Sequence, residues 1–162
     1  MRADAREVLS RRARELAQRP VAATAVRGTL SVFFTLGGEQ LAVEARWLLG
    51  VTKLGALAAL PGAEPPLRGI TTWRGELLTV LDVRTLLGIP TTGLTDMTRL
   101  LVMGVGRPRF GLIVDTVGDC VDLPENHIRP VSDSSRAQQY VLGVTSDARL
   151  VLDGARLLEL FD

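Results

Sequence analysis

The feature that most constrains the fold is an internal repeat with a spacing of about 71 residues. The segment VLDVRTLL at 80–87 aligns with VLDGARLL at 151–158, so an aspartate and a pair of leucines recur in the same places. A chain that carries one pattern twice is expected to fold as two related units. Two further pairs of segments align in the same way. LAVE at 41–44 aligns with LIVD at 112–115, and RGITT at 68–72 aligns with LGVTS at 142–146 once a short gap is allowed.

Beyond residue 28 the chain consists of short apolar runs separated by glycine, proline and aspartate. Runs of this length, bounded by turn residues, are typical of strands and too short for most helices. We therefore predict a mostly β domain at 29–162, with two lobes at about 29–95 and 96–162. Antiparallel lobes avoid free sheet edges by closing into small barrels, so two packed barrels are expected. The predicted strands are 30–36, 40–45, 48–54, 69–73, 76–81, 99–105, 109–114, 117–123, 139–145 and 149–152.

Three aspartates follow apolar runs and are interpreted as structural. Asp82 and Asp153 occupy the same place in the two copies, just before a short helical pattern. Each can accept hydrogen bonds from the first free amides of that helix. Asp115 also ends an apolar run, and we expect it to bond to turn amides because no second acid stands in a recognisable paired position.

Residues 1–28 are predicted to form an N-terminal helix and a linker. Asp4 and Glu7 make a capping-box pattern, and apolar residues recur at helical spacing until Pro20, which indicates a helix over 4–18. Six of the first twenty residues are arginines. They are expected to form a solvated face, and docking to an acidic or membrane surface is the alternative.

Composition excludes several classes of protein. A formal net charge of +1 and an aromatic content of 4% argue against a nucleic-acid platform, which needs a basic stripe and stacking rings. One cysteine and one histidine cannot build a disulfide framework or a metal cluster, and no cofactor motif is present. No apolar stretch is long enough to insert into a membrane. We therefore expect a protein of the reducing cytoplasm.

The residues that could carry chemistry have plainer interpretations. His127 is the only imidazole and stands in the turn-like LPENHIRP, so we expect a surface side chain. Cys120 lies between Asp119 and Asp122, whose charges disfavour a thiolate. The glycines of GVGRPRFG at 104–111 fall between two predicted strands and open no helix, so they indicate a hairpin turn and not a phosphate loop. The inventory favours a binding module and not an enzyme.

Four segments together resemble the CheW domain of bacterial chemosensory systems: LSVFFTLGGEQLAVEARWLLGV, LPGAEPPLRGITTWRGELLTVLDVRTLLGI, FGLIVDTVGDCVDLPENHIRP and YVLGVTSDARLVLDGARLLEL. The resemblance covers residues 29–160, and its most specific part is the G-x-x-x-x-R-G pattern from Gly69 to Gly75. It implies two intertwined five-stranded SH3-like β-barrels around a shared hydrophobic interior, with short helices. This agrees with the duplication.

The resemblance also implies a role. Proteins of this family are non-enzymatic adaptors that couple the signalling tips of methyl-accepting chemoreceptors to the regulatory domain of the histidine kinase CheA, at receptor arrays in the cytoplasm. Self-association or ring assembly is a further possibility that the sequence leaves open. The alternative is a divergent CheW-domain scaffold or competitor that binds only one partner or serves a non-standard pathway.

Partner-binding residues follow from the resemblance, position by position. Arg74 matches the arginine of the family's N-L-R-G hairpin, and the third predicted strand and the second lobe supply the receptor-facing side. The hairpin positions are Arg68, Gly69, Thr72, Trp73, Arg74 and Gly75, and the receptor-facing positions are Leu48, Gly50, Val51, Gly111 and Val117.

The sequence departs from the family pattern in this region. Thr72-Trp73 replaces the family's Asn-Leu, Thr79 replaces a usual proline, and Gly50 replaces a strand glutamate, which removes a charge from the expected interaction face. Arg74 is expected to contact a partner, because arginine dominates many interfaces, and internal pairing is the alternative. Trp73 either contacts a partner or folds back to cap a barrel.

Overall fold

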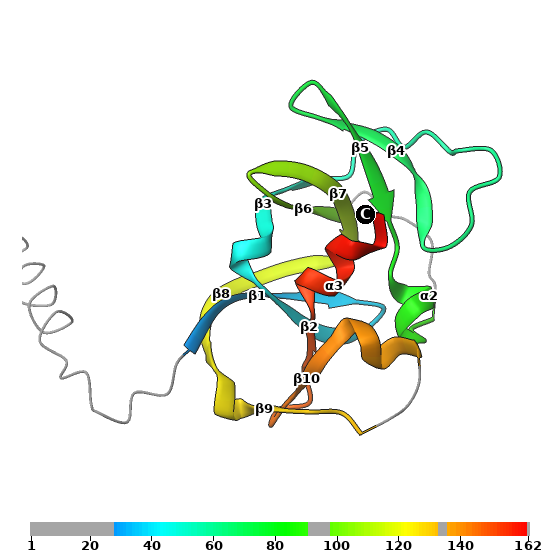
Figure 1. The fold of residues 1–162 in the computed structure, drawn as a ribbon. Coiled ribbons are helices and arrows are strands. Elements are labelled where there is room, and N and C mark those ends of the chain that lie inside the picture. Colours follow the sequence, from blue (N-terminus) through cyan, green and yellow to red (C-terminus); the bar gives the residue numbers. More distant parts are fainter. Residues whose placement is uncertain (1–27, 91–97, 133–135, 162) are drawn as a thin grey trace, which may run out of the picture.

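The computed structural model describes residues 28–90, 98–132 and 136–161, and Figure 1 shows their arrangement. The predicted N-terminal helix over 4–18 and its linker lie outside the described residues. The strands are β1 (Gly28–Leu36), β2 (Glu39–Glu44), β3 (Leu48–Lys53), β4 (Leu67–Trp73), β5 (Glu76–Leu81), β6 (Arg99–Val105), β7 (Arg107–Val114), β8 (Thr116–Pro124), β9 (Ile128–Arg129), β10 (Val141–Thr145) and β11 (Leu150–Leu152). The helices are α2 (Arg84–Leu87) and α3 (Gly154–Leu158), and the 3-10 turns are η1 (Ala45–Trp47), η2 (Glu125–His127), η3 (Arg136–Tyr140) and η4 (Glu159–Phe161).

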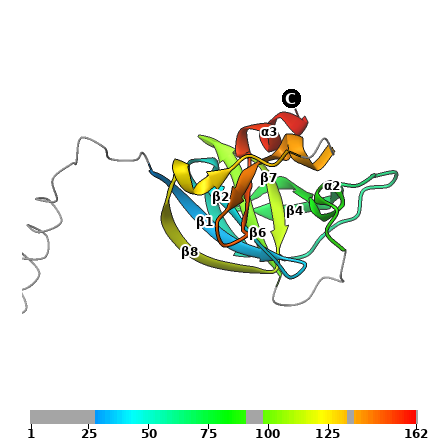
Figure 2. The ribbon, with the colours of Figure 1, turned by 90° about the horizontal axis from the view of Figure 1, so that it is seen from below.

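The strands form two sheets, and the mostly β prediction is confirmed. Sheet A has the order β8-β1-β2-β11-β10-β9, and sheet B has the order β3-β6-β7-β5-β4. Nearly all the apolar runs identified in the sequence are strands, and the two-residue β9 is an addition to them. In both views of the molecule β1 runs from the side where it pairs with β8 towards α2 (Figure 2).

Neither sheet is built from one half of the chain. Sheet B takes β3, β4 and β5 from the first half and β6 and β7 from the second, and sheet A makes the reciprocal exchange. Strands of the two halves pair in parallel as β5 with β7 and β11 with β2, and antiparallel as β3 with β6 and β1 with β8. The two copies of the repeat are therefore intertwined. The lobe boundary near residue 95 falls in a segment that the structure does not describe, and it stays a prediction about the sequence.

Three apolar clusters fill the space around the sheets. The shared interior lies between them and includes Phe34 and Leu41 from sheet A with Leu101, Met103 and Phe110 from sheet B. A second cluster, the barrel B core, lies on the other face of sheet B and holds Leu78, Val80, Leu100, Val102 and Ile113. A smaller third cluster holds Ala42, Leu123 and Val151 of sheet A.

The position of the central strands between two apolar clusters explains why their sequences are apolar without alternation. Side chains of a strand point alternately to its two faces. In β6, Leu101 and Met103 enter the shared interior, while Leu100 and Val102 enter the barrel B core. A strand covered on both faces needs apolar residues at every position. This is why the run LLVM at 100–103 is uninterrupted.

The repeated aspartates bond to helix amides as predicted, but in different ways. Asp153 is the N-cap of α3 and accepts a hydrogen bond from the amide of Arg156 at 3.2 Å. Asp82 precedes the N-cap of α2, Val83, and accepts from the amide of Arg84 at 3.1 Å. The predicted hydrogen bond to an amide of the first helical turn is confirmed at both positions, and Asp153 is also the N-cap.

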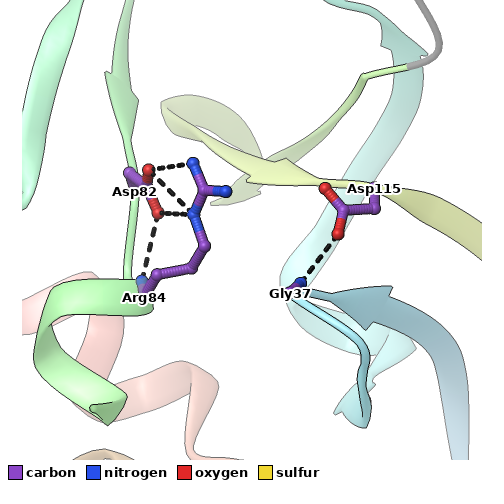
Figure 3. A network of polar contacts seen from close by, with 4 residues as sticks. All are labelled: Gly37, Asp82, Arg84 and Asp115. Atoms are coloured by element: carbon purple, nitrogen blue, oxygen red, sulfur yellow. Dashed lines mark hydrogen bonds and ion pairs between the residues drawn. The ribbon is translucent and has the colours of Figure 1, made fainter. Parts of the chain in front are cut away.

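Asp82 also binds the guanidinium of Arg84, which the sequence analysis did not anticipate (Figure 3). Nε of Arg84 donates to Oδ1 at 2.9 Å and Nη2 donates to Oδ2 at 2.6 Å. The arginine is 1% exposed. Hydrogen bonding to Asp82 raises the pKa of Arg84 above its usual value, against the opposing effect of burial, and the charge of Asp115 acts in the same direction as Asp82. A buried cation is tolerated because this carboxylate compensates it.

Asp115 lies near the Arg84–Asp82 pair and links the two sheets through a hydrogen bond (Figure 3). It follows β7 of sheet B, and its Oδ2 accepts a hydrogen bond of 2.7 Å from the amide of Gly37, in the turn between β1 and β2 of sheet A. Gly37 has φ +59, a left-handed conformation that favours glycine. The predicted structural role of Asp115 is confirmed. No helix among the described residues has the length and apolarity needed to cross a membrane.

We expect Arg84→Ala to lower the free energy of unfolding by about 3 to 5 kcal/mol, because it leaves Asp82 buried without its partner. Arg156 is a matched control, since its ion pair with Glu159 is solvent-exposed and Arg156→Ala should cost less than about 1 kcal/mol. Urea unfolding followed by circular dichroism measures both. Equal losses in the two variants would contradict a structural role for the buried pair.

Candidate functional site

The hairpin between β4 and β5 presents Arg74 at its tip. The hairpin reaches beyond the rest of the molecule at the top of Figure 1. Arg74 and Gly75 form the turn with φ values of +49 and +80, and both residues are exposed. Neither a hydrogen bond nor an ion pair joins Arg74 to another described residue. Its guanidinium instead lies over the ring of Trp73, with Cζ 4.4 Å from the ring centroid.

Trp73 turns inward and covers the barrel B core. It is half-buried and packs on that cluster together with Leu49, Leu54 and Leu57. Trp73 pairs with Glu76, which lies two residues before Leu78 and four before Val80. Because side chains alternate along a strand, Trp73 is on the same face of the hairpin as the buried Leu78 and Val80. Of the two roles considered for Trp73, the structure shows the barrel cap.

Gly50 makes room for the indole. A Cβ placed on Gly50 would lie 3.1 Å from Cζ2 of Trp73, closer than most real contacts. Two positions at which the sequence departs from the family pattern, Gly50 and Trp73, therefore adjoin in space.

The other hairpin positions divide into exposed and buried residues. Arg68 and Thr72 are exposed on β4. Gly69 is buried with φ +153, and a Cβ there would collide with the carbonyl oxygen of Ala58. That oxygen accepts a hydrogen bond of 2.8 Å from the amide of Ile70. Gly69 therefore shapes the strand and supports the hairpin without presenting a side chain.

Leu48, Val51 and Val117 lie around the shared interior. Leu48 and Val51 pair with Met103 and Leu101, so they point to the face of sheet B that packs on sheet A. Val117 pairs with Phe34 on the facing sheet. Leu48 and Val117 are half-buried against the shared interior, and Val51 is exposed at its margin. The structure thus brings these three predicted positions to one apolar border.

Gly111 does not belong to that border. It is buried in β7, in register with Val102 and Val80, and so faces the barrel B core under the side chain of Leu100. A larger residue there would collide with Leu100. Gly111 determines how closely the strands pack and offers no surface to a partner.

Residues that no sequence motif indicated extend the apolar border. Leu30, Val32 and the buried Phe34 alternate along β1 and share one face. Cys120 pairs with Val32 on the same face. Leu30 and Cys120 are exposed and Val32 is half-buried. The alternation of TLSVFFTL could have identified these positions. We define the apolar border as Leu30, Val32, Leu48, Val51, Val117 and Cys120.

Exposed charges are distributed unevenly between the two sheets. On the strands and connections of sheet B the exposed cations are Lys53, Arg68, Arg74 and Arg107, with Glu64 and Glu76 as exposed acids. On the strands and turns of sheet A the exposed acids are Glu39, Asp119, Asp122, Glu125 and Asp147, with Arg129 as an exposed cation, and the exposed Arg46 lies in η1 between the two sheets. Such polarity steers and orients charged partners.

The residues considered above as possible catalytic or phosphate-binding groups have structural positions that match the plainer interpretations. His127 is exposed in η2, and Cys120 is an exposed strand residue of β8, both as predicted. The GVGRPRFG segment spans the end of β6, the turn at Gly106 and the start of β7, as the hairpin interpretation required. The described residues contain no cluster of three or more potential metal ligands.

Comparisons with known proteins agree with this architecture. The family model for the CheW-like domain matches residues 31–161. The chain is 26% identical to the chemotaxis protein CheW of Bacillus subtilis over 135 residues, covering 83% of this chain and 84% of that protein. It is 32% identical to the protein FrzA of Myxococcus xanthus over 112 residues, covering 68% and 70%.

A solved structure has the same fold. The scaffolding protein TtCheW from Thermoanaerobacter tengcongensis aligns with a TM-score of 0.67 at 23% sequence identity, covering 78% of this chain and 89% of that one. The agreement supports the two intertwined barrels predicted from the sequence.

The left-handed turn at Arg74 has a measurable consequence. We expect Arg74→Gly to be more stable than Arg74→Ala by about 1 kcal/mol, because glycine adopts positive φ without the steric cost that a Cβ carries. Both variants remove the same guanidinium, so each serves as the control for the other. Thermal and urea unfolding compare them, and a more stable alanine variant would contradict the turn geometry.

Proposed function

The chain belongs to the CheW-like family of chemotaxis scaffold and adaptor proteins, and on that basis we propose that it couples chemoreceptors to a CheA-type histidine kinase. Proteins of this family are not enzymes. The observation that carries the proposal is the exposed guanidinium of Arg74, which is held on Trp73 and has no ionic partner among the described residues. A guanidinium that is exposed and has no ionic partner among the described residues is available to bind another protein.

The hairpin supports the proposal through its rigidity. The turn fixes the backbone of Arg74, the indole fixes its guanidinium, and Gly50 seats the indole on sheet B. A planar guanidinium with several donors can bind a carboxylate in bidentate fashion. Because its orientation is set before binding, little side-chain entropy is lost when the partner arrives. Arg68, Thr72 and Gly75 provide the exposed surroundings of this contact.

The apolar border supports a second contact. Stable protein interfaces combine an apolar centre with a polar rim. The border continues the shared interior to the surface through the half-buried Leu48 and Val117 and ends at the exposed Val51 and Leu30. We propose that a receptor signalling tip contacts this border while the kinase regulatory domain contacts the Arg74 hairpin. The protein would then work in the cytoplasm at receptor arrays, where it could also associate with itself or with kinase domains in rings.

One observation favours a second candidate function. Gly50 lacks the glutamate of the family pattern, and the adjoining space is occupied by Trp73. A protein with one altered contact surface could bind a single partner and act as a scaffold or competitor. The two functions differ in whether receptor and kinase bind together.

Reconstitution tests the coupling. Purified protein, added to the kinase and receptor encoded in the same genome, should make kinase autophosphorylation depend on the receptor. We expect Arg74→Glu to weaken kinase binding by about 2 kcal/mol without changing the circular dichroism spectrum, as for an interface hot spot. Val51→Asp should instead weaken receptor binding. Arg129→Glu, an exposed charge reversal on sheet A, is the matched control.

The outcomes separate the alternatives. Binding of one partner only, with no receptor control of the kinase, would favour the competitor. Loss of folding in the Arg74→Glu variant would show that the arginine is a structural support. An Arg129→Glu effect as large as that of Arg74→Glu would show that the binding is not specific to the hairpin.

A further inference from the structure

The two most exposed large hydrophobic side chains of the described chain stand close to exposed arginines. Leu77 is 77% exposed and Val105 is 63% exposed. Leu77 follows the Arg74 turn by three residues, and Val105 pairs with Arg107 across the next hairpin. Single exposed apolar residues need no explanation, but their concentration at one place indicates an interaction surface.

The sheet register places both hairpin tips at the same end of sheet B. β5 and β7 are parallel neighbours, and each begins just after its hairpin turn. The β4–β5 and β6–β7 turns therefore lie at one end of the sheet. Figure 1 shows the first of these tips projecting from the molecule, with the β6–β7 turn on the same side of the sheet.

The side chains at the two tips also share a face. In β5 the alternation that sends Leu81 into the shared interior places Leu77 on the same side. A β-bulge separates Met103 from Gly104, but its extra residue, Arg109, is on β7. The alternation of β6 is therefore kept, and Val105, two residues beyond the buried Met103, faces the same way. Arg107 is opposite Val105, and Thr72 is opposite Leu77. We call these four residues, Thr72, Leu77, Val105 and Arg107, the overhang.

The overhang is the part of sheet B that sheet A does not cover. Leu81 and Met103 on the same face are buried, whereas all four overhang residues are exposed. The sheet continues past its packing partner and leaves an apolar face uncovered. Such a face is costly in water unless another surface covers it for part of the time.

Charge identifies the occupant. The exposed charged residue of the overhang is Arg107, which pairs with Val105. Arg74 and Glu76 lie with Trp73 on the opposite face of the hairpin. The overhang therefore combines apolar side chains with a guanidinium group that no acidic residue of the same four accompanies. A complementary partner presents a carboxylate beside apolar side chains. We propose that the overhang binds an acidic protein segment whose apolar residues cover Leu77 and Val105.

The inference rests on the proposed function in one respect, that the occupant is a protein. It assigns Leu77, Val105 and Arg107 to a contact surface on the face of the hairpins opposite Trp73. Arg107 then has an apolar centre next to it, which is where interface residues contribute most to affinity.

A peptide titration tests the inference without kinase or receptor. The probe is a fluorescent peptide of alternating glutamate and leucine, compared with a lysine–leucine and a glutamate–serine peptide of equal length. We expect the full chain to bind the glutamate–leucine peptide most tightly. Arg107→Glu and Leu77→Ser should each weaken that binding about tenfold, as expected for a charged and an apolar anchor. Added salt should weaken binding of the same peptide to the unmodified chain.

Matched controls come from sheet A. Arg129→Glu reverses an exposed arginine and Leu142→Ser removes a partly exposed leucine, and both should leave the affinity unchanged within a factor of about two. Circular dichroism confirms that each variant is folded. The proposal is overturned if the peptide does not bind, if all three peptides bind equally, or if the overhang variants bind as tightly as the controls. A failed reconstitution with a positive titration would reject the adaptor role and keep the overhang.

Discussion

The structure depends on an exchange of strands between the two halves of the chain. Parallel pairing of β5 with β7 and of β11 with β2 places segments of both repeats in each sheet. The exchange forces the central strands to be covered on both faces, since one face lies on the shared interior and the other inside a barrel. The apolar composition of these strands, the close packing at Gly111 and the bond of Asp115 across the two sheets all follow from that arrangement.

The Arg74 hairpin shows how the same packing produces a functional surface. The barrel B core needs a cover at its open side, and Trp73 provides it because Gly50 leaves room for the indole. The guanidinium of Arg74 then lies over the indole ring of Trp73. A stability requirement and a recognition requirement are met by adjacent residues. A guanidinium supported by its neighbour's ring offers a better-defined geometry than one on a free side chain.

Much of the fold could be predicted from the sequence, for identifiable reasons. The repeat of VLDVRTLL gave the duplication, and short runs bounded by turn residues gave the strands. Asp153 was interpreted correctly because helix capping depends on residues nearby in the sequence. Asp115 was expected to bond to turn amides, and it does, but its partner Gly37 lies far away in the sequence and could not be identified from it. The buried state of Arg84 could not be predicted, because it depends on how α2 packs and on its proximity to Asp82 and Asp115 in the folded chain.

The candidate site was predicted less completely than the fold. The resemblance placed Leu48, Val51 and Val117 at one border, and the register of β3 and β8 explains why they meet. It also suggested Gly111, whose burial depends on the facing Leu100, a contact that motif matching cannot reveal. Leu77 and Val105 escaped notice because an exposed apolar residue in a strand looks like a core residue until the extent of the opposite sheet is known.

The strand exchange also determines how late in translation the domain can complete its folding. Sheet A lacks its inner strand β11 until residues 150–152 have been synthesised, although β1 and β2 are made near the start of the domain. Until then the inner edge of β2 and the shared interior are open to water and to other nascent chains. Completion of the domain is therefore a late, long-range event, of the kind that slows folding and makes chaperone capture useful during translation.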